Sequence, residues 1–257
     1  MLERNYDEVP WTTEQTFAGT LFTLIPWLVF SLLLAFSAST TSQPKAITLQ
    51  QDTANAIAGL IVGIISEGIF LIAPVYFANR ATNHRLHLRR IRWRAVFDVL
   101  GFRRFSVLRS LTLVILFFLA ILAVNMLYSL LITALHLSIQ TNDQVVLERG
   151  RTMPISTYTT LAAAVFIAPT CEEVFFRSFV FMGLRRGMSL TLSIIISALI
   201  FAIAHADPAS FPVLIIIGIA LAILRWRTSS IWPSIILHTL NNATSTLLII
   251  LTLRGVM

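Results

Sequence analysis

Three groups of polar residues lie inside strongly apolar stretches in the last third of the sequence. In chain order they are Glu172 and Glu173 with Arg177, then Phe201 with His205, then His238 with Asn242. A charged side chain within a membrane-spanning helix costs about 2.5–3.5 kcal/mol on insertion scales, so its retention indicates a function. Carboxylates and imidazoles are the side chains that most often transfer protons in hydrolytic reactions.

Helical geometry separates the two adjacent acids. Glu173 and Arg177 are four residues apart, so they share one face of a helix and can form an ion pair. Glu172 is rotated by about 100° from that face and is left without the arginine. An unpaired, buried carboxylate suits a general base. The alternative is that both acids pair with Arg177 and serve packing alone.

The histidines have partners at the same spacing. His205 follows Phe201 by four residues, and His238 precedes Asn242 by four. A lone histidine in a span is more often a packing or proton-relay group. Counting residues from the arginines at the helix ends places Glu172, both histidines and Asn242 in one layer of the membrane. The sequence therefore predicts one shared polar cavity.

Such a set can activate water for the hydrolysis of a peptide bond. A carboxylate and a histidine would hold and deprotonate the water, while a second histidine and an amide would donate hydrogen bonds to the oxyanion. A zinc hydrolase is the main alternative, but no His-Glu-x-x-His motif occurs and the ligands would come from three spans. No Gly-x-Ser-x-Gly motif occurs, and the two acids beside Cys171 disfavour its thiolate. We expect no metal and no other cofactor.

The composition requires a membrane environment for this chemistry. Of the 257 residues, 56% are hydrophobic and 12% are charged, whereas soluble domains have about 25% charged residues. The net charge of +7 does not indicate nucleic-acid binding, because the basic residues are clustered between apolar runs. A single cysteine excludes a disulfide-bonded scaffold.

The predicted fold is an all-α polytopic bundle of about seven transmembrane spans. The apolar runs that we interpret as spans are 17–37, 55–79, 109–137, 157–184, 189–206, 211–226 and 231–253. The run at 211–226 is the shortest and the least secure of these. Pro169 interrupts the fourth run, so a separate helix over 157–168 would bring the total to eight.

The distribution of arginines predicts the orientation. With a cytoplasmic N-terminus, fourteen basic residues lie on the inner side and four on the outer side. Residues 1–14 lack the basic start of a signal peptide, so the first run is expected to remain as a span. The basic loop 80–109 is either an amphipathic segment on the inner leaflet or an ordinary topology anchor. We divide the chain into an N-terminal region of three spans, 1–155, and a catalytic core, 156–257.

The three motifs resemble those of the CAAX protease and bacteriocin-processing family of glutamic intramembrane endopeptidases. The resemblance covers roughly residues 160–250 and includes Ala168-Pro169 and Trp232-Pro233 beside the motifs. It implies that Glu172 is the general base, that His205 positions the water, and that His238 and Asn242 line the oxyanion site. Glu173, Arg177 and Phe201 would support the site or orient the substrate. Ser178 stands where the family commonly has glycine.

We therefore expect a metal-independent intramembrane endopeptidase in a prokaryotic plasma membrane. Its partners would be membrane lipids and a membrane-associated or lipidated peptide or protein, of the CAAX or the bacteriocin type. Two alternatives remain: a non-catalytic scaffold or self-immunity protein of the same fold, and a proton-coupled transporter that uses Glu67 with Glu172 and His205. For Glu67 we favour a satisfied polar contact between helices. The oligomeric state is left open.

Overall fold

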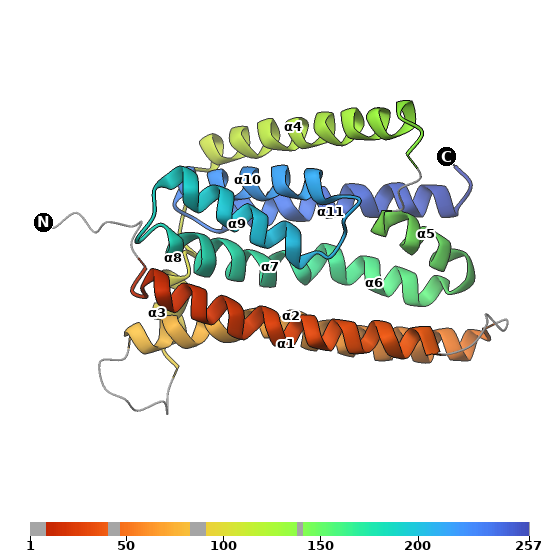
Figure 1. Ribbon diagram of the computed structural model, residues 1–257, viewed down its shortest axis with the longest axis horizontal. Coiled ribbons are helices and arrows are strands. Elements are labelled where there is room, and N and C mark those ends of the chain that lie inside the picture. The colour runs from red at the N-terminus through yellow and green to blue at the C-terminus, as the bar shows by residue number, and fades with distance from the viewer. Residues whose placement is uncertain (1–8, 41–46, 83–90, 138–140, 257) are drawn as a thin grey trace, which may run out of the picture.

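The computed structural model describes residues 9–40, 47–82, 91–137 and 141–256, and these residues form helices and no strands (Figure 1). The elements are α1 (Thr13–Thr40), α2 (Leu49–Thr82), α3 (Trp93–Val99), α4 (Val107–Ala134), α5 (Asn142–Thr152), α6 (Pro154–Phe166), α7 (Ala168–Glu173), the π-helix η1 (Val174–Phe181), α8 (Met182–Leu184), α9 (Leu190–Ala204), α10 (Phe211–Thr228) and α11 (Trp232–Leu253). The predicted all-α polytopic bundle is confirmed.

Each of the seven predicted spans contains a helix, but only six are long and apolar enough to cross a membrane. The short one is α9, with 15 residues and a length of about 22 Å. The run at 211–226, which looked least secure, is the 18-residue α10. α9 stops because Ala206 adopts a positive φ of 49° and Asp207 then accepts hydrogen bonds from the backbone of Ala209 and Ser210.

Pro169 does not create an eighth span. α6, α7, η1 and α8 follow one another along a single membrane-length segment, Pro154–Leu184. Ile167, with φ −104° and ψ −57°, separates α6 from α7, and the segment continues through the π-helix η1. Pro169 lies in the first turn of α7, where a missing N–H donor leaves no hydrogen bond unmade. The helix predicted over 157–168 exists as α6, yet it belongs to the same span as α7.

The segment from α6 to α8 is the centre of the bundle. In Figure 1 the pair α1 and α2 runs along one side of it, and α4 lies on the opposite side beyond α10 and α11. α2 packs against α6, α7 and η1, while α9 and α11 cover other faces of the central segment. All eight residues of η1 are buried. The large exposed side chains of α1, α2 and α4 are mostly apolar, as expected for faces in contact with lipid.

The arginine-rich loop is only partly described. Residues 83–90 of this loop, with Arg85, Arg89 and Arg90, lie outside the described residues, so its interpretation as an amphipathic segment is not tested there. Two further basic residues, Arg4 and Lys45, also lie outside the described residues. Residues Trp93–Val99 form α3. Gly101 follows with φ 86°, and the guanidinium of Arg225 lies against it in the protein interior. Arg225, which was counted with the inner surface, is therefore buried.

A buried aspartate connects the N-terminal region to the central segment. Asp52, near the start of α2, accepts hydrogen bonds from the backbone N–H groups of Ile155 at 2.8 Å and Ser156 at 3.1 Å. These N–H groups lie in the first turn of α6 and have no partner within their own helix. A carboxylate at a helix N-terminus also interacts favourably with the helix dipole. Asp52 thus caps a helix more than 100 residues away in sequence.

We expect Asp52→Ala to lower the free energy of unfolding by about 1–3 kcal/mol, because two N–H groups at the start of α6 lose a charged acceptor. Thermal unfolding of the purified protein in detergent micelles measures this change. Gln50→Ala is the matched control, since Gln50 is exposed on the same turn of α2. Equal melting temperatures for the two variants would show that the cap contributes nothing.

Candidate active site

A cavity of about 450 Å³ opens inside the bundle beside the central segment. Its wall is formed by residues from eight of the described helices, namely α2, α4, α5, α6, α7, α9, α10 and α11. The wall of this cavity includes five of the residues that the sequence motifs indicated: Glu172, Phe201, His205, His238 and Asn242. The remaining polar side chains of the wall are Glu67, Asn125, Asn142, Asp143, Thr160, Asp207, Ser210, Asn241, Ser245 and Thr246.

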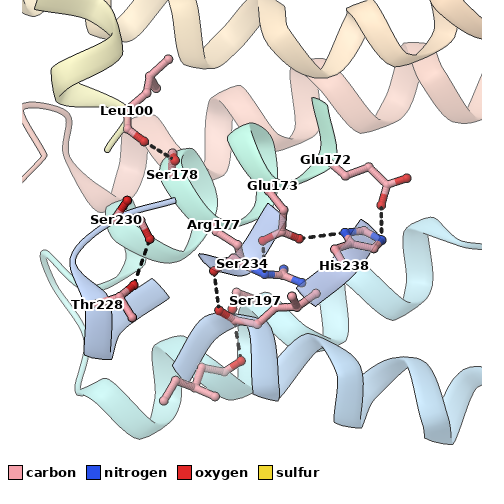
Figure 2. Close-up of polar contacts among 12 residues, drawn as sticks. Leu100, Glu172, Glu173, Arg177, Ser178, Ser197, Thr228, Ser230, Ser234 and His238 are labelled. Atoms are coloured by element: carbon pink, nitrogen blue, oxygen red, sulfur yellow. Dashed lines mark hydrogen bonds and ion pairs between the residues drawn. The ribbon is translucent and has the colours of Figure 1, made fainter. Parts of the chain in front are cut away.

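Glu173, Arg177 and His238 form a buried chain of ionisable side chains (Figure 2). Glu173 Oε2 lies 3.3 Å from Arg177 Nε, and the side chains of both residues are fully buried. Glu173 Oε1 lies 3.0 Å from His238 Nδ1. Since a paired carboxylate accepts hydrogen bonds, His238 donates its Nδ1–H and turns Nε2 towards the cavity.

Aromatic rings complete the surroundings of Arg177. Its guanidinium carbon lies 4.5 Å from the centre of the Phe201 ring and 5.9 Å from that of Phe176. A cation over an aromatic face is stabilised by the ring quadrupole. Neither Glu173 nor Arg177 is part of the cavity wall. The structure therefore gives both residues contacts that orient His238 and Phe201, without direct access to the cavity.

Glu172 points the other way and faces both histidines. Its Oε2 lies 3.6 Å from His205 Nε2 and 3.8 Å from His238 Nε2. Both distances are longer than the donor–acceptor distance of a direct hydrogen bond. Glu172 Oε2 is therefore buried without a hydrogen-bond partner among the described residues. A carboxylate oxygen and two imidazole nitrogens thus converge on one region of the cavity. The two acids take different partners, so the interpretation that both clasp Arg177 is not what the structure shows.

The backbone sets the orientation of His205, which lies directly after the last residue of α9. Its Nδ1 lies 2.8 Å from the carbonyl oxygen of Phe201. A carbonyl oxygen can only accept, so His205 donates Nδ1–H, and its Nε2 is an acceptor when the ring is neutral. The rings of Phe201 and His205 are also in contact, with centres 4.3 Å apart. His205 is thereby prepared to accept a proton or a hydrogen bond on the side that faces Glu172.

Asn242 is held by α6. Its Nδ2 donates to the carbonyl oxygen of Ala164 at 2.9 Å, near the end of that helix. Its Oδ1 accepts from Nδ2 of Asn241 at 3.4 Å. An amide nitrogen carries two hydrogens, so one N–H of Asn242 is left over for a group in the cavity.

Several wall residues escaped the sequence analysis. Asn125 and Asp143 come from the N-terminal region, and Asp207 comes from the turn between α9 and α10. The pKa of Asp143 is raised overall, by partial desolvation and the nearby Asp207 carboxylate, against a hydrogen bond with Ser245 that lowers it. Asn125 is a single polar residue in a span, and such residues far away in sequence from the motifs give no signal of a common cavity.

Glu67 lies in the wall of the same cavity, although its helix α2 is distant in sequence from the three motifs. Its Oε2 is buried and has no hydrogen-bond partner among the described residues. The interpretation of Glu67 as a satisfied contact between helices is therefore wrong for this oxygen. Glu67 faces the polar cavity.

Ser178 connects η1 to the loop after α3. Its hydroxyl donates to the carbonyl oxygen of Leu100, and the side chain is fully buried. Next to it, Ile231 donates its backbone N–H to the oxygen of Gly101. Ser178 thus ties the central segment to the loop that follows α3.

The zinc alternative would require at least three potential metal ligands close together. Within residues 9–40, 47–82, 91–137 and 141–256, no three His, Cys, Asp or Glu side chains are grouped so that they could hold a metal ion. Cys171 is a buried free thiol and does not line the cavity.

Comparison with known families supports the motif assignment. Residues 154–244 match the type II CAAX prenyl endopeptidase Rce1-like family. The resemblance that the three motifs indicated is confirmed over this Rce1-like region, which contains α6 to α10 and the site-forming part of α11. The match does not reach α1 to α5, so Glu67 and Asp52 lie outside it.

Two curated proteins are also similar to this chain. The protein named "Putative membrane peptidase YdiL" from Bacillus subtilis is 29% identical over 101 residues, which are 39% of this chain and 40% of the relative. An uncharacterized protein of Mycoplasma capricolum is 32% identical over 142 residues, 50% of this chain and 40% of the relative. The chain thus spans well under half the length of both curated relatives. No solved structure matches.

We expect Arg177→Ala to destabilise the Rce1-like region by about 3–5 kcal/mol, because it leaves the buried charge of Glu173 without its cation. The matched control is Arg151→Ala at an exposed position of α5, which should leave the melting temperature unchanged. Thermal unfolding in micelles compares the two variants. A melting temperature of Arg177→Ala within error of the wild type would contradict the structural importance of this ion pair.

Proposed function

We propose that this protein is an intramembrane endopeptidase that hydrolyses a peptide bond with a water molecule activated by Glu172 and His205. One observation carries the proposal: Glu172 Oε2 is buried without a hydrogen bond and lies within 4 Å of two imidazole nitrogens, in a cavity inside a membrane bundle. The similarity of residues 154–244 to CAAX prenyl endopeptidases supports the same class of reaction.

The first step is the removal of a proton from water. A water molecule between Glu172 and His205 would donate one hydrogen bond to each, because Glu172 Oε2 and the neutral His205 Nε2 are both acceptors. As the water oxygen attacks the carbonyl carbon of the scissile bond, Glu172 takes the proton. No side chain of the protein becomes covalently bound to the substrate in this mechanism.

The negative charge of the tetrahedral intermediate requires hydrogen-bond donors. In our proposal Asn242 supplies its remaining N–H, and His238 supplies Nε2–H in the doubly protonated form of its ring. Both residues lie on α11, one helical turn apart. The buried pair Glu173–Arg177 keeps His238 oriented through Nδ1. These donors are held by contacts that exist before substrate binds, and such preorganisation is the main source of electrostatic catalysis.

We further propose a membrane-associated or lipidated peptide or protein as the substrate, in the CAAX or bacteriocin class. The apolar part of the cavity wall, including Leu161, Val213 and Ile217, suits an apolar segment beside the scissile bond. We propose the plasma membrane of a prokaryote with a cytoplasmic N-terminus, on the grounds of the arginine distribution. Lipids and this substrate are the partners that we expect.

Glu172→Gln should abolish cleavage while the protein stays folded, because glutamine has nearly the same shape but cannot accept the proton from water. The measurement is a quantitative comparison of peptide termini in membranes from cells that express the wild type or the variant. Termini that depend on Glu172 identify the substrate. Glu148→Gln, at an exposed position of α5, is the matched control and should give the wild-type pattern.

Identical peptide termini in the wild type and Glu172→Gln would exclude the proposed mechanism. If Glu172→Gln also kept the full biological activity of the wild type, the protein would instead be a scaffold or immunity factor of the same fold.

A further inference from the structure

The carboxyl group of Glu67 has an unusual position in this molecule. It comes from α2, which packs against α6, α7 and η1 from outside the region of family similarity. Glu67 lines the cavity together with Glu172 and His205, and its Oε2 is buried without a hydrogen bond among the described residues. Two carboxyl groups from different helices thus share the cavity.

No cation in the cavity wall neutralises this second carboxyl group. The wall contains no lysine or arginine among the described residues. Arg177, the arginine nearest in sequence to Glu172, is buried and paired with Glu173. The titratable groups that face the cavity from the surrounding elements are Glu172 on α7, His205 after α9, His238 on α11, Asp143 on α5 and Asp207 before α10.

Electrostatics limits how many of these groups carry a charge. Ionising a buried carboxylic acid without a partner is costly, and a second carboxylate in the same low-dielectric cavity increases the cost. Glu172 lies within 4 Å of two imidazole nitrogens, and an imidazole stabilises a carboxylate when its ring is protonated, whereas Glu67 Oε2 has no hydrogen-bond partner among the described residues. This arrangement suits Glu172 to the role of base and Glu67 to the role of proton donor.

We propose that Glu67 is the catalytic acid of this site and that it donates its proton to the nitrogen of the leaving amine. This inference depends on the proposed peptidase function. Water adds to the carbonyl carbon and Glu172 takes one of its protons. The C–N bond then breaks as Glu67 transfers its proton to the nitrogen. The product is a carboxylic acid and an amine, and one proton passes from Glu172 to Glu67 to restore both groups.

Asp207, another acid of the wall, is less suited to this role because backbone groups already occupy its carboxyl group. Asp207 Oδ1 accepts from the N–H groups of Ala209 and Ser210, and its Oδ2 accepts from that of Asn142. These three hydrogen bonds engage both carboxyl oxygens of Asp207. Glu67 is the acid with an uncommitted oxygen beside Glu172.

The test compares two leaving groups on one peptide. The peptide found to depend on Glu172 is synthesised with its natural scissile amide and, separately, as the 4-nitrophenyl ester of the same acyl part. An amine must be protonated to leave, whereas 4-nitrophenolate leaves without a proton. We expect Glu67→Gln to lower kcat for the amide by about 10²–10⁴-fold and to leave hydrolysis of the ester unchanged.

Two variants control this comparison. Glu172→Gln should lose both activities, because both substrates need the activated water. Glu67→Asp should recover part of the amide hydrolysis, since it restores a carboxylic acid. Equal losses of amide and ester hydrolysis in Glu67→Gln, or wild-type rates with both substrates, would overturn the proposal.

A second measurement on the purified protein does not require a substrate. In the infrared difference spectrum of wild type minus Glu67→Gln at neutral pH, we expect the C=O band of a protonated carboxylic acid, shifted in D₂O. Carboxylate bands in its place would overturn the assignment of Glu67 as a proton donor. Because this result does not depend on turnover, it separates a failure of the Glu67 assignment from a failure of the peptidase function.

Discussion

The buried interaction among Glu173, Arg177 and His238 is the constraint on which the site depends. Three ionisable side chains with almost no exposure to solvent lie together there, Glu173 in an ion pair with Arg177 and in a hydrogen bond with His238. The central segment must therefore lie deep in the bundle, enclosed by α2, α9, α10 and α11. The aromatic residues of η1 fill the space around it, and Phe201 contacts both Arg177 and His205.

This constraint also explains why the two adjacent acids differ. The rotation between consecutive helix positions turns Glu173 towards Arg177 and Glu172 towards the cavity. A π-helix begins at the next residue, and π-helical turns are frequently found at functional sites. One acid is thus used to orient a histidine, and the other is left without a hydrogen bond beside both histidines. The proposed division into a structural acid and a catalytic base follows from this geometry.

Much of the architecture could be predicted from the sequence because its causes are local. Apolar runs of sufficient length predict helices, and the four-residue spacings of Glu173–Arg177, Phe201–His205 and His238–Asn242 place the members of each pair on one face. The short α9 could not be predicted, because it ends through the positive φ of Ala206 and the backbone contacts of Asp207. Helix packing over long distances in sequence brings Glu67 to the cavity and Asp52 to the start of α6. No periodicity within α2 indicates those partners.

The central claim is that glutamate chemistry, without a bound metal, activates the water. The most direct measurement is the cleavage rate of the purified wild-type protein before and after exhaustive dialysis against a chelator, with the metal content determined in the same sample. We predict an unchanged rate at a metal content far below one ion per protein. A loss of activity that added zinc restores would contradict the account.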